Sequence, residues 1–141
     1  GRIRGLDPSR IHVHRGVGRL LDLAARADLA VTAGGSTVWE LACLGIPMVV
    51  LGTAANQDAV LRGLQAEQAA LVLGPMQSLS QGEIAEAVRS LLAAPSRLRD
   101  LSRAASRLVD GRGGERVIEV IEGVLARSVS RPGASVGMVK S

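Results

Sequence analysis

The chain has 141 residues, with 17 Lys and Arg against 13 Asp and Glu, 47% hydrophobic residues and a single aromatic residue, Trp39. This length fits one domain, and the apolar content excludes wholesale disorder. The formal charge of +4 does not indicate nucleic-acid binding. Arg127, Arg131 and Lys140 contribute three of the four excess charges from the C-terminal tail, and Phe and Tyr, which would stack on bases, are absent.

The cysteine content and the longest apolar stretch bear on the compartment. Cys43 is the single cysteine, so it cannot form a disulfide within the chain, and the apolar residues around it predict a small core residue. The stretch from Leu41 to Leu51 is too short to cross a bilayer and contains Gly45 and Pro47. We therefore expect a cytoplasmic protein without a membrane span.

The first half of the chain alternates between strand and helix patterns. Ile11 to His14 alternates apolar and polar residues as a short strand does, and Val17 to Ala27 has helical spacing. Later apolar runs predict three buried strands, and the segments after the first two predict helices. The strands are Leu29 to Ala33, Ile46 to Leu51, and Ala70 to Leu73; the helices are Val38 to Leu44, which Gly45 ends, and one that Asn56 caps and that carries Val60 and Leu64.

The second half of the chain predicts helices only. Ser80 and Glu83 form a capping-box pattern ahead of a helix that ends near Pro95, and Leu98 to Leu108 marks a second helix. After a turn at 110–114, Val117 to Leu125 marks a third. From the end of that helix Ser, Gly, Pro and Arg dominate, so we expect a domain over residues 1–126 and a disordered tail over 127–141.

Buried strands that alternate with helices of about ten residues are typical of right-handed crossover units and a parallel sheet. The predicted fold class is therefore α/β, with a Rossmann-like parallel sheet followed by C-terminal helices. In such sheets, ligands bind beyond the carboxyl ends of the strands, where loops lead into helices.

The loop Gly34-Gly35-Ser36-Thr37 follows a predicted strand and opens a helix. Glycines let the backbone approach a ligand, and a helix start offers free N–H groups to an anion, so a phosphate or diphosphate would fit here. The sequence is neither a P-loop nor the Gly-x-Gly-x-x-Gly of dinucleotide-binding folds, which makes the motif alone weak.

Glu40 lies one turn into the helix after the glycine loop and has two interpretations. Its carboxylate could accept both hydroxyls of a ribose. Alternatively, Thr37 to Glu40 is a capping box in which Glu40 accepts from the N-cap N–H.

Asn56 and Gln57 follow the next buried strand, so their amides are expected at the same edge of the sheet, where they could bind diphosphate oxygens or sugar hydroxyls. The alternative is that Asn56 only caps its helix.

The remaining polar candidates favour structural roles. His12 and His14 lie on one face of their predicted strand but have no Cys or carboxylate at metal-site spacing, so we expect no metal site. Asp110 to Gly113 is most simply a turn between helices, although Arg116 could reach a phosphate.

Several of these motifs together resemble a known family. They are residues 27–40 with their Gly-Gly-Ser-Thr-Val-Trp-Glu, Leu44-Gly45-Ile46-Pro47, Asn56-Gln57, and Val109 to Gly113 with Arg116-Val117. This set is similar to the C-terminal domain of the UDP-sugar hydrolase of the pseudaminic acid pathway, which releases UDP from a 2,4-diacetamido-2,4,6-trideoxy hexose. That family is related to the two-domain GT-B glycosyltransferases, especially the N-acetylglucosaminyltransferase of peptidoglycan synthesis.

The resemblance implies a UDP-sugar site that needs no metal and no cofactor. The glycine loop would meet the diphosphate, Glu40 would bind ribose, and the loop 14–17, here assigned through Val17, would contact uracil through its backbone. Asn56 and Gln57 would face the sugar and the diphosphate. The implied reaction is attack of water on the anomeric carbon with UDP as leaving group; a related transferase would use an acceptor hydroxyl instead of water.

The chain also departs from the family pattern. The family's proposed catalytic histidine lies in an N-terminal domain, and neither His12 nor His14 matches it, so no catalytic residue is assigned here and the base is expected from an N-terminal domain or partner chain. The family's first two strands also have no counterpart, which predicts exposed sheet edges. A non-catalytic remnant is the third interpretation.

Overall fold

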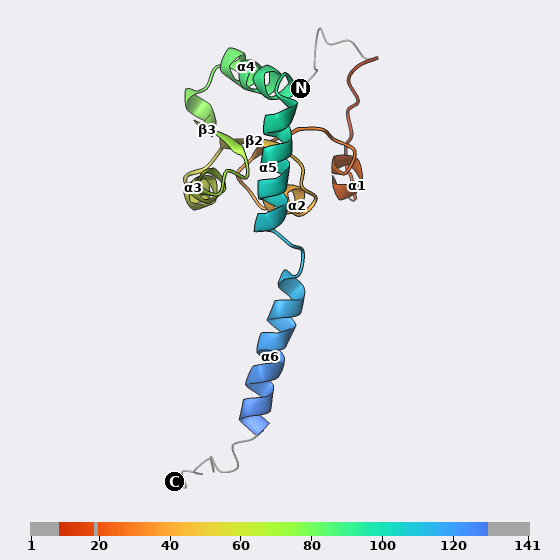
Figure 1. Cartoon of the computed structure of the whole chain (residues 1–141), viewed down its shortest axis with the longest axis vertical. Coiled ribbons are helices and arrows are strands. Elements are labelled where there is room, and N and C mark those ends of the chain that lie inside the picture. Colours follow the sequence, from red (N-terminus) through yellow and green to blue (C-terminus); the bar gives the residue numbers. More distant parts are fainter. Residues whose placement is uncertain (1–8, 19, 130–141) are drawn as a thin grey trace, which may run out of the picture.

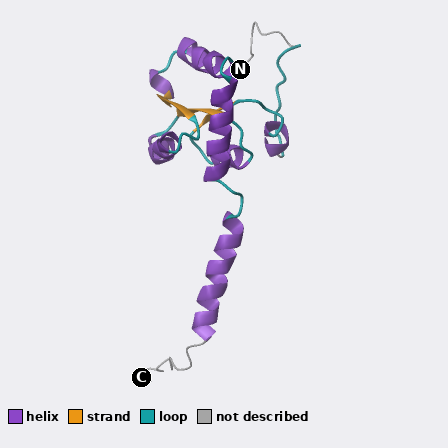
Figure 2. Ribbon diagram, in the orientation of Figure 1, coloured by secondary structure: helices purple, strands orange, loops and turns teal. Residues whose placement is uncertain are grey.

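The computed structural model describes residues 9–18 and 20–129. Three parallel strands form one sheet in the order β1-β2-β3, and helices surround it (Figures 1 and 2). The strands are β1 (Ala30–Ala33), β2 (Met48–Gly52) and β3 (Leu71–Pro75). The α/β class with a Rossmann-like parallel sheet and C-terminal helices is confirmed.

The helices follow the predicted order with somewhat different bounds. A short α1 (Leu20–Ala24) precedes the sheet, and α2 (Thr37–Cys43) and α3 (Asp58–Ala66) connect the strands. Beyond β3 lie α4 (Gln81–Leu92), α5 (Pro95–Leu108) and α6 (Gly113–Val129). Two 3-10 turns, Ala55–Gln57 and Met76–Ser78, follow β2 and β3. Because α6 reaches Val129, the first three residues of the predicted tail are helical, and the rest of it lies outside the described residues.

Strand β2 is the centre of the fold because it pairs on both sides and is buried along its whole length. Its side chains alternate between the two faces of the sheet. Met48 and Val50 belong to a core that includes Val38 of α2 and Leu64 of α3, whereas Val49 packs with residues of α4 and α5. Continuous burial of this kind explains why the strand is an unbroken apolar run in the sequence.

Local signals set several helix ends as predicted. Gly45 adopts a φ of +66°, its N–H donates to the Ala42 carbonyl, and the N–H of Ile46 donates to the Leu41 carbonyl, which is the Schellman arrangement. At the start of α4, Ser80 and Glu83 form the predicted capping box: the Glu83 N–H donates to Ser80 Oγ, and the Ser80 N–H donates to Glu83 Oε2.

Two predictions for the N-terminal region are wrong. Residues 11–14 form no strand, and Ile11 and Val13 are exposed. An extended segment needs a neighbouring strand for its N–H and C=O groups, and the described sheet pairs no strand with this segment. The helix predicted over 17–27 is limited to α1, which has five residues.

Candidate functional site

The candidate site is the edge of the sheet where β1 and β2 end, because the glycine loop, Glu40 and the 3-10 turn at 55–57 all follow these carboxyl ends. The N–H of Gly34 donates to the Leu51 carbonyl over 3.0 Å, so this residue extends the β1–β2 ladder and its amide is not available to a ligand. The next three residues lead into α2: Gly35, the N-cap Ser36 and the first helical residue Thr37. The described residues provide no acceptor for their N–H groups.

The two glycines of the loop have different roles. A Cβ on Gly34 would lie 3.0 Å from Leu61 Cδ2 and 3.4 Å from Gln57 Cβ, so Gly34 is needed for packing against α3 and the turn before it. A Cβ on Gly35 would meet nothing within 4 Å. Open space at Gly35 is what close approach of a ligand to the backbone requires, so the expectation of backbone approach applies to Gly35 rather than to Gly34.

The capping-box interpretation of Glu40 is wrong. The N-cap of α2 is Ser36, whose φ and ψ of −62° and −27° are helical, and no side chain caps the helix. Glu40 is therefore the fourth helical residue rather than the third, and it cannot accept from the N-cap N–H as Glu83 does in α4. Its carboxylate is exposed and makes no ion pair or hydrogen bond within the described residues, which leaves it free for another role.

Gln57 lies against the glycine loop, and its amide is partly used by the fold. Its Oε1 accepts from the Thr53 N–H over 2.9 Å and from Thr53 Oγ1 over 3.2 Å, which closes the turn after β2. The side-chain NH₂ of Gln57 has no partner within the described residues and remains as a donor. Asn56 is exposed within the 3-10 turn and is not the helix cap, because α3 begins after Gln57 and has no side-chain cap.

Other predicted residues lie apart from this edge or have structural roles. Val17 is exposed in the segment before α1. Cys43 is exposed on α2, so the prediction of a core residue is wrong: two residues after the buried Leu41, its side chain projects from the opposite side of the helix. Within the described ranges, no group of three or more His, Cys, Asp or Glu residues is arranged to hold a metal ion.

Asp110 and Arg116 form the predicted helix-linking turn. The two side chains pair through both carboxylate oxygens, and Asp110 Oδ1 also accepts from the Arg112 N–H over 3.0 Å. The hydrogen bond from Arg116, followed by that from Arg112, lowers the pKa of Asp110 to about 2. Because the guanidinium of Arg116 is already paired, it is not available to a phosphate.

Two of the cavities formed by the described residues flank the sheet, and neither of these two is lined by the glycine loop. The smaller, about 320 Å³, lies at the carboxyl ends of β2 and β3 and is lined by Gly52, Leu61 and Asp58 among others. Leu61 connects it to the loop, because a Cβ on Gly52 would also lie 3.0 Å from this side chain. The Asp58 carboxylate disfavours an anion in this cavity, so a diphosphate fits better on the glycine-loop side.

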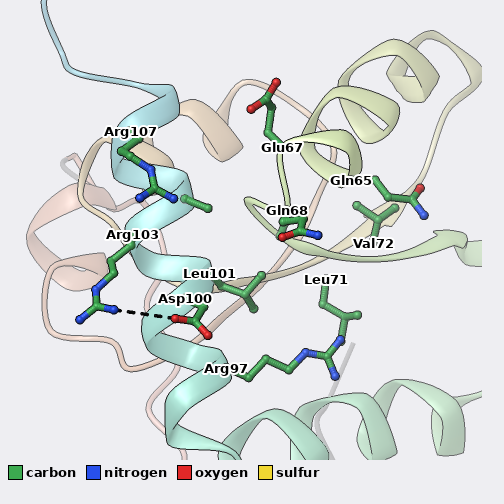
Figure 3. Close-up of a pocket in the computed structure, with 12 residues that line it drawn as sticks. Gln65, Glu67, Gln68, Leu71, Val72, Arg97, Asp100, Leu101, Arg103 and Arg107 are labelled. Atoms are coloured by element: carbon green, nitrogen blue, oxygen red, sulfur yellow. Dashed lines mark ion pairs between the residues drawn. The ribbon is translucent and has the colours of Figure 1, made fainter.

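The larger cavity, about 690 Å³, lies between α5 and the connection from α3 to β3 (Figure 3). It is lined by Arg97, Arg103 and Arg107 and by polar residues that include Gln68 and Asp100, and the sequence analysis did not identify it. Asp100 and Arg103 are 3.8 Å apart, and both side chains are at least 70% exposed. The charges of this pair are thus screened by solvent, and the glycine loop at the carboxyl edge remains the better candidate on chemistry.

Comparison with known proteins supports a glycosyltransferase-like family. The chain is 31% identical over 112 residues to the spore coat polysaccharide biosynthesis protein SpsG of Bacillus subtilis, which covers 76% of this chain and 32% of that protein. It is 31% identical over 113 residues to the uncharacterized glycosyltransferase MK0977 of Methanopyrus kandleri, which covers 79% of this chain and 31% of that protein. The chain thus spans about a third of the length of these curated relatives.

No family model and no solved structure matches the chain. None of the described helices is long and apolar enough to cross a membrane. The fold and the two relatives together support a relationship with glycosyltransferase-like proteins.

Proposed function

We propose that the carboxyl edge of this sheet binds a UDP-sugar. The observation that carries the proposal is the position of Glu40: an exposed, unpaired carboxylate one helical turn beyond the free amides of Gly35, Ser36 and Thr37. Backbone amides and the start of a helix favour phosphate oxygens, and a free carboxylate suits the two hydroxyls of a ribose. The spacing therefore fits a nucleoside diphosphate that lies across the start of α2.

The residues after β2 extend this assignment. The free NH₂ of Gln57 and the exposed amide of Asn56 would donate to diphosphate oxygens or sugar hydroxyls without adding charge. The loop at Val17 would meet uracil. No metal or cofactor is needed, because the developing charge on UDP would be stabilised by backbone N–H groups.

For the reaction, we propose hydrolysis of the UDP-sugar, with a 2,4-diacetamido-2,4,6-trideoxy hexose as the sugar. Water attacks the anomeric carbon, the bond between that carbon and the diphosphate oxygen breaks, and UDP leaves with the bonding electrons. This chain's residues hold and stabilise the leaving diphosphate, and the base that takes the proton from water comes from an N-terminal domain or partner chain. A cytoplasmic location fits a nucleotide-sugar substrate.

A glycosyltransferase is the second candidate. The Methanopyrus kandleri relative favours it, because that protein is named a glycosyltransferase. In that case an acceptor hydroxyl replaces water and the leaving group stays the same. Incubation with candidate UDP-sugars, UDP-2,4-diacetamido-2,4,6-trideoxy hexose and UDP-N-acetylglucosamine, without an acceptor and in the presence of the partner half, separates the two activities. Rapid release of UDP and free sugar indicates a hydrolase, whereas release that depends on an added acceptor indicates a transferase.

Calorimetric titration of UDP tests the binding proposal directly. We expect Glu40→Ala to weaken UDP binding by about tenfold, since loss of a hydrogen bond to a charged group costs roughly 1.5 kcal/mol. Glu119→Ala is the matched control, because Glu119 is exposed on α6 and lines neither the carboxyl edge nor the larger cavity, and it should bind as the wild type does. Equal affinity of wild type and Glu40→Ala contradicts the ribose assignment, and no binding by any variant favours a non-catalytic remnant.

A further inference from the structure

Helix α6 carries an apolar stripe that the rest of the described chain leaves uncovered. Figure 1 shows α6 pointing away from the sheet, beyond the end of α5. Six of its apolar side chains are between 50% and 65% exposed: Val117, Ile118, Val120, Ile121, Val124 and Leu125. Amphipathic helices in globular proteins are held mostly by packing of the apolar face, so a stripe of this size requires a covering surface.

The shape of the stripe indicates what kind of surface covers it. At 100° per residue, the six side chains span roughly 160° of the helix, and Glu115, Glu119 and Glu122 lie on the opposite side. A two-stranded coiled coil uses a narrower seam of a and d positions. The width therefore favours packing against a folded surface rather than pairing of two α6 helices.

A matching surface lies on α2, next to the point where α6 begins. The outer side of α2 exposes Trp39, Cys43 and Leu44, opposite its buried Val38 and Leu41. A Cβ on Gly111 would lie 3.1 Å from Cys43 Sγ, so the connection between α5 and α6 touches the end of this α2 surface. The stripe and the α2 surface thus start from neighbouring points.

The connection can allow α6 to change direction. Gly111 has a φ of +74°, and a Cβ on Gly113 or Gly114 would meet nothing within 4 Å. The pairing of Asp110 with Arg116 and the bond from the Arg112 N–H hold this turn in the open arrangement, and because Arg116 belongs to α6, closure has to break the Asp110–Arg116 pairing. Glycines without packing neighbours are suited to a hinge.

We propose that α6 folds back about the 110–114 hinge so that its apolar stripe covers the outer side of α2 in the same molecule. The seven residues of α2 span about 10 Å, and the 17 residues of α6 span about 25 Å. After closure, α6 is therefore long enough to cover Leu44, Cys43 and Trp39. The inference concerns packing and does not rest on nucleotide binding.

Trp39 reports directly on this closure, because it is the single aromatic residue of the chain and is 39% exposed in the open arrangement. The experiment measures quenching of its fluorescence by acrylamide in the full chain without UDP. We expect Ile121→Glu, which places a charge in the stripe, to raise the quenching constant at least twofold and to shift the emission to longer wavelength. Ala126→Glu adds the same charge on the acidic side of α6 and should leave both values as in the wild type.

Two further measurements keep the outcomes distinct. If Ile121→Glu loses far-UV circular dichroism, Val124→Ser replaces it as the milder stripe variant. Quenching is also recorded over a hundredfold range of protein concentration, where closure within one molecule gives a constant value. Equal quenching in wild type and stripe variants overturns the proposal, and so does protection of Trp39 that disappears on dilution, because α6 would then cover a second copy.

Discussion

Strand β2 and helix α6 are both rich in Val, Ile and Leu, yet their surroundings are opposite. Every residue of β2 is buried between two layers of helices, whereas the six apolar side chains of α6 are at least half exposed. The comparison shows that apolar patterning specifies which face of an element needs cover but does not by itself supply the cover. Stability should therefore depend on β2 and its neighbours much more than on α6.

The largest difference should be between the core behind β2 and the α6 stripe. Leu64 is fully buried in the core that contains Met48 and Val50, so Leu64→Ala should lower the free energy of unfolding by about 2–5 kcal/mol. Ile121→Ala should cost about 1 kcal/mol if α6 closes on α2, because closure buries roughly half of the side chain. Urea unfolding measures both, and a larger loss for Ile121→Ala would reverse the comparison.

A second contrast lies within the glycine loop. Gly34→Ala should lower stability by about 1–3 kcal/mol, because its Cβ would press on Leu61 and Gln57. Gly35→Ala has open space and should leave stability nearly unchanged while weakening UDP binding. Thermal unfolding and UDP titration of the two variants test this division, which fails if Gly34→Ala is as stable as the wild type.

Two helix starts with similar sequence patterns should respond differently to loss of a hydroxyl. Ser80→Ala removes a capping hydrogen bond to the Glu83 N–H and should cost about 1 kcal/mol. Thr37→Ala removes no cap, since α2 has no side-chain cap, and should cost a few tenths of a kcal/mol at most. Similar losses at both positions would show that a capping box does form in α2.

The smallest effect concerns the turn that joins the body to α6. The pKa of Asp110 is lowered from 3.8 to about 2 by its hydrogen bonds from Arg116 and Arg112. A lowered folded-state pKa gives a contribution to stability that is fully present above pH 3.8 and is lost as the pH falls through about 2. Carboxyl NMR titration should show this value while α6 is in the open arrangement, and an Asp110 pKa near 3.8 would mean that the pairing with Arg116 is absent in solution.

Elements that depend on local chemistry could be predicted from the sequence. Gly45 ends α2 because only a residue tolerant of positive φ fits there, and the capping box at Ser80 uses side chains three residues apart. The alternation of apolar runs and helices likewise identified the parallel sheet, and the run of β2 is explained by burial on both faces.

The failures depend on contacts that are distant in sequence or on backbone angles. Residues 11–14 alternate as a strand does, but strand formation needs a partner that the pattern does not reveal. Thr37 to Glu40 has the same spacing as Ser80 to Glu83, but the helical φ and ψ of Ser36 shift the cap by one residue. For Gly34 the pattern could not reveal a packing contact, because Leu61 lies 27 positions later in the sequence.

Amide chemical-shift mapping with UDP tests the central proposal most directly, because it reports the position of binding residue by residue. The account predicts that the largest shifts occur at Gly35, Ser36 and Thr37, with smaller shifts at Glu40 and Gln57, and that Gln68 and Arg97 in the larger cavity are unchanged. Shifts confined to the larger cavity, or none at saturating UDP, would contradict a nucleotide site at the carboxyl edge of the sheet.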